Sequence, residues 1–250
     1  YFSRVMLNKQ KGNFYVNAAL GIISPGFEYN DLGSQWMADK INGHLVTGYR
    51  WYEPDDVFRN KSVYLGYSRT SDFEDNISRS GFYLNSNVQF LNYWGINFNT
   101  SYNFKSVSTT LTRGGPKLNI PSNISFNFSA YSDSREKITF SPYVSYWENA
   151  IGSNEKYFGF DVEWKPNSQI SFSIGPEYAL NYTSYQWVGN FSDPQAISTY
   201  NTRYVFAQIN QTTVSANIRL NWIFTPTLSL QLYMQPLISV GDYEDYRELN

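Results

Sequence analysis

The chain has 250 residues, of which 42% are apolar, 19% aromatic and 16% charged, and its formal net charge is −2. Cysteine is absent and histidine occurs once, which excludes disulfides and thiolate chemistry and leaves little room for histidine-based zinc or triad chemistry. The mean hydropathy is −0.45 and the pI is about 5.5, which excludes helical membrane spans and gives no basic footprint for nucleic acid.

Apolar and polar residues alternate through much of the chain. Between Ile96 and Lys105 the even positions are mostly apolar, whereas the odd positions hold Asn, Ser or Lys. A period of two indicates a strand with one apolar and one polar face. No stretch has a convincing apolar stripe with helical spacing, so we predict an all-β chain. The same period returns at residues 124–130, 158–165, 170–174, 214–222 and 228–234.

Turn signals divide the chain into about twelve strands. The short connections contain Gly, Pro, Asn, Asp or charged residues, whereas three connections are long, at residues 24–36, 108–120 and 184–202. The predicted strands cover residues 2–10, 13–23, 37–53, 57–73, 77–91, 94–107, 121–134, 137–149, 155–165, 169–183, 203–224 and 227–241.

The connections alternate between short turns and longer loops along the chain. Short turns on one rim and long loops on the other are typical of an antiparallel up-and-down transmembrane β-barrel. The predicted strands are also long enough for a tilted span of about 9–11 residues. We therefore predict an outer-membrane barrel domain over residues 1–250, located in the bacterial outer membrane.

The tryptophans concentrate near predicted strand ends. Such amphipathic rings favour the headgroup level of a bilayer. Trp36 and Trp187 fall in predicted long loops, and no tryptophan lies at the middle of a predicted strand. The predicted interface girdle is Trp51, Trp94, Trp164 and Trp222 near short turns, with Trp147 near the opposite strand end.

The polar face of the strands is rich in Asn, Ser, Thr and Gln. These side chains would line a hydrated lumen or contact an internal plug, while the apolar face meets lipid and lipopolysaccharide. A charge on the lipid face would cost about 2–4 kcal/mol at mid-membrane. The predicted lumen-lining charged residues are Arg50, Lys105, Asp161, Glu163 and Arg219.

Several acidic residues and one histidine are candidates for catalysis or metal binding. Two carboxylates can hydrolyse glycosides, but Asp161, Glu163 and Glu177 are better explained as lumen charge. Asp55-Asp56 and Glu74-Asp75 are expected to be turn residues, and a Ca²⁺ site at these acidic turns is the less favoured alternative. His44 is expected to be structural. No catalytic constellation, cofactor or metal is therefore predicted.

Two short motifs have structural explanations. Thr112-Arg113-Gly114-Gly115-Pro116 lacks the Gly-Lys-Ser/Thr continuation and the following helix of a phosphate-binding loop, so a tight corner is expected. The Asn-x-Ser/Thr triplets follow from an Asn-rich and Ser-rich polar face. Examples begin at Asn99, Asn123, Asn127 and Asn181.

An ordered series of motifs runs over nearly the whole chain, at residues 24–28, 30–33, 48–54, 92–95, 111–116, 203–207, 211–213, 224–226 and 228–233. It resembles the C-terminal outer-membrane barrel of Bacteroidota proteins in the domain of unknown function 5916 family, which often carry an N-terminal family-nine carbohydrate-binding module. The resemblance implies a segment of a larger barrel that is incomplete at both ends, with a carbohydrate link through a module outside it. It supplies no catalytic residues.

Three functions follow from these patterns. The first is a membrane scaffold or pore that passes or binds a solute, with a carbohydrate among the expected partners. The second is an outer-membrane barrel hydrolase with a site in its long loops, for which His44 is the one histidine available. The third is a soluble all-β binding domain. The sequence favours the first.

Overall fold

The computed structural model describes residues 1–28, 30–33 and 37–249. Strands dominate it, with two single-turn 3₁₀ helices, η1 (Asn30–Leu32) and η2 (Ile197–Thr199). The strands are β1 (Phe2–Lys9), β2 (Phe14–Ile23), β3 (Lys40–Trp51), β4 (Phe58–Ser71), β5 (Ile77–Phe90), β6 (Gly95–Asn103), β7 (Ser106–Ser108), β8 (Leu118–Ile120), β9 (Asn123–Tyr131), β10 (Ile138–Asn149), β11 (Asn154–Asn167), β12 (Ile170–Ser192), β13 (Thr202–Thr225), β14 (Leu228–Met234) and β15 (Leu237–Glu248).

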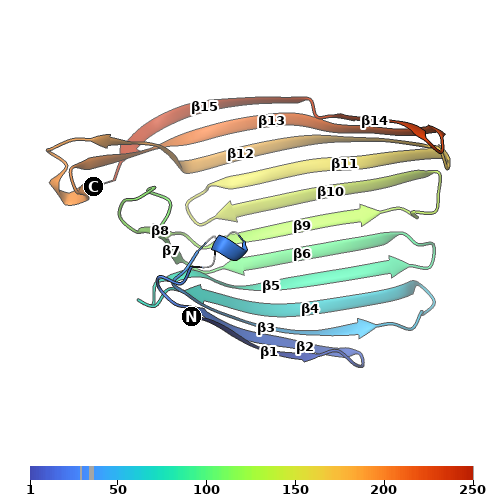
Figure 1. Cartoon of the computed structure of the whole chain (residues 1–250), viewed down its shortest axis with the longest axis horizontal. Coiled ribbons are helices and arrows are strands. Elements are labelled where there is room, and N and C mark those ends of the chain that lie inside the picture. Colours follow the sequence, from blue (N-terminus) through green and yellow to red (C-terminus); the bar gives the residue numbers. More distant parts are fainter. Residues whose placement is uncertain (29, 34–36, 250) are drawn as a thin grey trace.

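Thirteen of these strands form one antiparallel sheet, in which the strands pair in chain order up to β13, and β14 and β15 both pair with β13 (Figure 1). The small β7–β8 pair lies in the connection between β6 and β9, and β6 pairs directly with β9. The all-β meander predicted from the alternation is confirmed. Within the described residues β1 pairs with β2, β14 and β15 pair with β13, and no ladder joins the two sides. Closure into a barrel therefore stays a prediction.

The last predicted strand, 227–241, is longer than expected and interrupted. β14 and β15 both pair with β13, Met234 facing Ile218 and Leu237 facing Ser215, so the register continues across the gap. Pro236 lies in the gap because proline has no N–H to give to the ladder, although its carbonyl still accepts from the Ala216 N–H at 3.0 Å.

The prediction of a long loop over residues 184–202 is wrong for most of that range, which forms strand instead. β12 runs on to Ser192 and β13 begins at Thr202, so a hairpin extension replaces the loop and leaves a tip at residues 193–201. In Figure 1 this hairpin reaches beyond the other strand ends. Register shifts between Thr183 and Gln186 and between Trp187 and Gly189 break the period of two that marks a strand.

The register assigns each side chain to one of two faces. One row of directly paired residues is apolar across seven strands, and these residues define what we call the apolar face. A row on the opposite, polar face pairs Asn85 with Asn99, Asn99 with Asn127 and Asn127 with Ser145. The apolar row is Leu7, Ala18, Leu45, Tyr67, Phe82, Tyr102 and Ile124.

The apolar face has no second layer over it. Leu65, Phe158 and Trp164 are 54%, 50% and 47% exposed, although each belongs to a central strand. The buried apolar residues among those described are confined to β13 near the long loops: Tyr204, Phe206, Ala207 and Ile209. A sandwich core, which a soluble sheet of this size needs, is not present between described elements.

Tyrosines on the polar face lie across glycines of the neighbouring strand. A Cβ on Gly66 would come within 2.2 Å of the Tyr83 ring, and one on Gly159 within 2.3 Å of the Tyr143 ring. Each pair is directly opposed in the register. An aromatic ring that covers a strand glycine restores the packing that glycine lacks. Two further pairs of this kind are Gly48 with Tyr64 and Gly95 with Tyr131.

These contacts predict that Gly159→Ala destabilises the sheet. The added methyl group displaces the Tyr143 ring, and overpacking of this kind costs about 1–3 kcal/mol. Urea unfolding in detergent, followed by near-ultraviolet circular dichroism, measures the loss. Gly241→Ala is the control, because its nearest contact is the end of the Ile209 side chain at 3.2 Å. Equal effects of the two changes would contradict the packing role of the glycine.

Candidate functional site: two rims, an apolar belt and a polar cluster

Four tryptophans of the predicted girdle lie on the apolar face at the rim of short turns. Trp51 ends β3, Trp94 precedes β6, and Trp164 and Trp222 lie on β11 and β13. All four are between 38% and 47% exposed. Aromatic neighbours extend this row on the same face, with ring centroids 4.6 Å apart for Tyr49–Trp51, 5.2 Å for Phe58–Phe90 and 4.6 Å for Trp222–Phe224.

A second aromatic row lies on the apolar face at the rim of long loops. The rings of Tyr67 and Phe82 are 5.0 Å apart, and Phe104 lies 6.0 Å from Phe82 and 5.3 Å from Tyr102. Between the two rows the exposed residues are aliphatic or Phe, for example Leu65. We call the two rows and the apolar surface between them the apolar belt.

The other tryptophans are placed differently. Trp147 pairs with Ser125 and Glu155, a row that belongs to the polar face, so the register separates it from the other four girdle residues. Trp187 was expected in a loop, but it lies within β12. Trp36 lies outside the described residues.

A cation sits at the short-turn rim of the belt. The Lys61 ammonium lies 4.9 Å from the Phe58 ring centroid and 5.6 Å from that of Trp51, and it pairs with Asp55 at 2.7 Å. The carboxylate of Asp55 also accepts from the Val57 and Phe58 N–H groups. Lys61 and these hydrogen bonds lower the pKa of Asp55 to about 2. Asp55 therefore organises a turn and an ion pair, which is the structural role expected for it.

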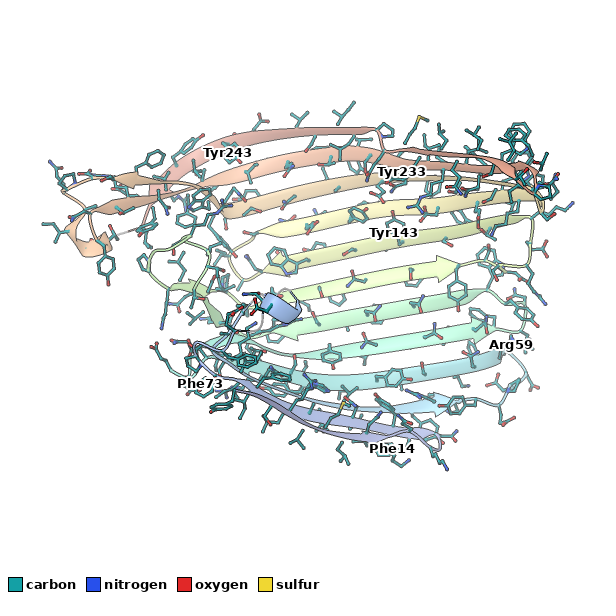
Figure 2. The ribbon with its side chains drawn as sticks, viewed as in Figure 1. Phe14, Arg59, Phe73, Tyr143, Tyr233 and Tyr243 are labelled. Carbon is teal, nitrogen blue, oxygen red and sulfur yellow. The ribbon has the colours of Figure 1, made fainter. Side chains whose placement is uncertain are left out.

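The polar face carries a hydrogen-bonded cluster around Glu177. Its carboxylate accepts from the Tyr143 hydroxyl at 2.9 Å, the Ser215 hydroxyl at 3.1 Å and the Asn217 amide at 3.3 Å. The Tyr233 hydroxyl donates to Asn217 at 3.1 Å. Tyr143 and Tyr233, labelled in Figure 2, come from β10 and β14, so this polar cluster links both sides of the β11–β13 region.

Three of the predicted lumen charges come together beside this cluster. Asp161, Glu163 and Arg219 line one cavity of about 400 Å³, whose other lining residues are Thr139, Ser141, Ser173 and Asn217. Glu163 pairs with Lys165 at 2.7 Å and accepts from the Ser171 hydroxyl. The Arg219 guanidinium lies 5.1 Å from the Tyr233 ring. The cavity is thus polar and carries charges of both signs.

The other two predicted lumen charges lie elsewhere. Arg50 is on the polar face of β3, where it donates to Tyr64 and to Tyr52 and stacks 4.4 Å from the Tyr15 ring. Lys105 follows the end of β6 and is exposed in the connection to β7, so it does not lie within the main sheet.

His44 does not assemble a catalytic set. Its Nε2 lies 2.6 Å from the amide oxygen of Asn17 on β2, and in the described part of the chain no hydrogen bond joins it to a carboxylate. Glu74 pairs with Lys117, and Asp75 pairs with Arg69. The hydrolase hypothesis therefore gains no geometric support.

The Thr112–Pro116 motif forms a folded corner that docks on the β12–β13 hairpin. The Thr112 side chain is fully buried, and its hydroxyl accepts from Gly115 N–H at 3.1 Å and donates to Pro116 O at 2.9 Å. The Asn190 amide donates to Thr112 O at 3.0 Å. The Arg113 guanidinium stacks 3.7 Å from the Trp187 ring centroid. We call this corner and its contacts the loop latch.

The whole chain matches a protein family. The model of the family described as Domain of unknown function (DUF5916) matches residues 1–250. The chain belongs to this family. No curated protein and no solved structure matches it. Among the described residues of this DUF5916 chain, no helix is long and apolar enough to span a membrane.

A cluster on the short-turn rim of the DUF5916 chain was not anticipated from its sequence. The Tyr93 ring lies between two guanidinium groups, 4.0 Å from Arg59 and 3.4 Å from Arg135. Arg135 and its backbone N–H bind Asp133, which lowers the pKa of that carboxyl to about 2. Arg59, labelled in Figure 2, thereby connects the first turn-proximal residues of β4 to two later turns.

The lowered pKa predicts a pH-dependent contribution from Asp133. A carboxyl whose folded pKa lies below the unfolded value of about 3.9 stabilises the fold above that value. The contribution is lost as the pH falls toward about 2. We expect wild type to unfold at higher urea than Asp133→Asn at pH 7, and this difference to shrink between about pH 4 and pH 2. A difference that is constant with pH would contradict the ion pair.

The loop latch predicts that Thr112→Val loosens the connection between β6 and β9. The substitution leaves a buried N–H and carbonyl without their partner, which costs about 1–3 kcal/mol. Limited trypsin digestion should then cut faster at Arg113 or Lys117. Thr109→Val, at an exposed position of the same connection, is the control. Unchanged cleavage in Thr112→Val would show that the latch does not hold the loop.

Proposed function

We propose that this DUF5916 chain forms part of the wall of a bacterial outer-membrane β-barrel, as a scaffold or a pore. The observation that carries the proposal is the apolar belt, which is exposed, bounded by aromatic rings at both rims and backed by a polar face. Lipid-facing bands flanked by aromatic girdles are the signature of transmembrane barrels.

The dimensions of the belt suit a bilayer. On the β6 path the two rims are marked by Trp94 and Phe104, about ten residues apart, and about 3.3 Å per residue gives about 33 Å. A strand tilt of about 40° reduces this to about 25 Å, the height of the apolar band in outer-membrane barrels. A belt much shorter or longer than this would not match the lipid.

The two faces then have different partners. Lipid and lipopolysaccharide would cover the belt, and the ladders of Asn and Ser on the polar face would meet water. Asn87 donates to Asn97 at 2.6 Å, and Asn97 donates to Ser129 at 3.2 Å. A solute in the lumen would meet the polar cluster, whose hydroxyl, amide and carboxylate groups suit a polar or carbohydrate ligand.

Membrane insertion also requires closed edges. In lipid each unsatisfied backbone group costs several kcal/mol, so an open edge cannot face hydrocarbon. The exposed edge strands, β1 on one side and β14 with β15 on the other, would therefore need to pair, with further strands or with each other. A soluble binding domain would instead need a covering layer for the whole belt.

Leu65→Arg tests the lipid-facing assignment. An arginine near the middle of the belt should cost about 2–4 kcal/mol of folding free energy in lipid. Asn85→Arg, on the polar face of the adjacent strand, is the matched control and should fold normally. The measurement is the fraction of chain that inserts into vesicles and migrates as the compact form on gels before boiling. If Leu65→Arg inserts as well as Asn85→Arg, the belt does not face lipid.

Conductance measurements distinguish the pore from the scaffold. An open pore should give discrete steps in planar bilayers, whereas a plugged scaffold should insert without steps. A chain that stays monomeric and soluble without detergent would contradict both forms.

A further inference from the structure

A second cavity, of about 510 Å³, lies at the long-loop rim and has no part in the belt or the polar cluster. Four separate segments build it: the β6–β9 connection, the β10–β11 turn, the β12–β13 hairpin and the end of β15. Its size lies within the range of about 300–1,000 Å³ that is typical of small-molecule sites. Its apolar wall consists of Leu111, Leu118, Pro121, Ile151, Phe206 and Leu249.

The wall of this cavity is held in place by hydrogen bonds. The loop latch fixes the connection that carries Leu111 and Leu118. On the opposite side, the Ser153 hydroxyl lies 2.7 Å from that of Ser184 and accepts from the Ser184 N–H at 2.9 Å. Phe206 is only 8% exposed. The site is therefore formed before a ligand arrives, which reduces the entropy cost of binding.

The mouth of the cavity carries a cation, Arg247, and an anion, Asp245, that form only a long ion pair with each other. β15 bulges opposite Phe206 and Gln208, and Asp245 takes the left-handed conformation there, with φ of +48°. Bulges re-aim side chains and are frequent beside ligand sites. The Asp245 carboxylate and the Arg247 guanidinium are 3.4 Å apart and each is 63% exposed. Both line the cavity.

A third charged residue at the mouth, Glu248, is already paired with a cation of the protein. Glu248 is bound by Arg203, which also holds Asp193 at 2.6 Å. This leaves Asp245 and Arg247 to meet a ligand. A carboxylate suits the guanidinium, with its planar fork of donors, and an ammonium suits the acceptor oxygens of Asp245.

From this arrangement we propose that the cavity binds a small zwitterion with an apolar body. The apolar part lies against Leu118 and Phe206, the anionic group faces Arg247 and the cationic group faces Asp245. The site does not depend on the proposed membrane function, because its residues lie beyond the belt and would be built in the same way in a soluble chain.

The test uses four indole probes that share a body and differ in charge. L-tryptophan carries both charges, indole-3-propionate the anion, tryptamine the cation and indole neither. Titration calorimetry on the full chain should give L-tryptophan at least about tenfold tighter binding than any of the other three. Equal binding of all four, or no saturable binding, would overturn the proposal.

Two variants test which charged group of the ligand binds Arg247 and which binds Asp245. Arg247→Gln should weaken L-tryptophan about tenfold and leave tryptamine within about threefold. Asp245→Asn should weaken L-tryptophan equally and leave indole-3-propionate unchanged. Asparagine tolerates the left-handed backbone, so this variant keeps the bulge. If both variants bind L-tryptophan as wild type does, the charged mouth does not recognise the ligand.

A third variant tests the apolar wall. Leu118→Trp fills the cavity and should abolish L-tryptophan binding, while Ile138→Trp, on the exposed apolar face of β10, should leave it intact. Circular dichroism and gel migration report whether each variant folds. A folded Leu118→Trp that still binds L-tryptophan with wild-type affinity would place the ligand elsewhere and contradict the proposal.

Discussion

The structure depends on one constraint, the parity of side chains along paired antiparallel strands. Directly paired residues share a face, so a single slip of one residue would turn every side chain of a strand to the wrong side. Here the parity holds from β1 to β9 in the row from Leu7 to Ile124, and it produces an uncovered apolar face opposite ladders of Asn and Ser. The belt, the polar cluster and the proposed barrel all follow from this separation.

Local pattern was sufficient to predict much of this fold. The strands with strict alternation, such as those through Phe98 and Phe160, agree with the predicted ranges to within a few residues. Four of the five predicted girdle tryptophans lie on one face, near the short turns. The errors occur where the period breaks. Two register shifts break the alternation in the outer half of β12, so the sequence pattern there does not indicate a strand. Pro236 separates β14 from β15, although both pair with β13 in one continuous register.

The remaining features depend on register, which a sequence does not specify locally. The pairing of Gly159 with Tyr143 and the position of Trp147 on the polar face become visible only when strands are aligned. The Tyr93 cluster and the loop latch join segments far apart in the chain. A glycine at a polar-face position was the available signal for the tyrosine pairs, because alternation alone gives no reason for it.

Depth-resolved quenching of tryptophan fluorescence by brominated lipids tests the central claim most directly. In vesicles, single-tryptophan variants that retain Trp51, Trp94, Trp164 or Trp222 should all be quenched most by bromines close to the headgroups, at one common depth. A variant that retains Trp147, on the polar face, should be quenched much less. Absence of quenching, or equal quenching at all five positions, would contradict an apolar belt that faces lipid.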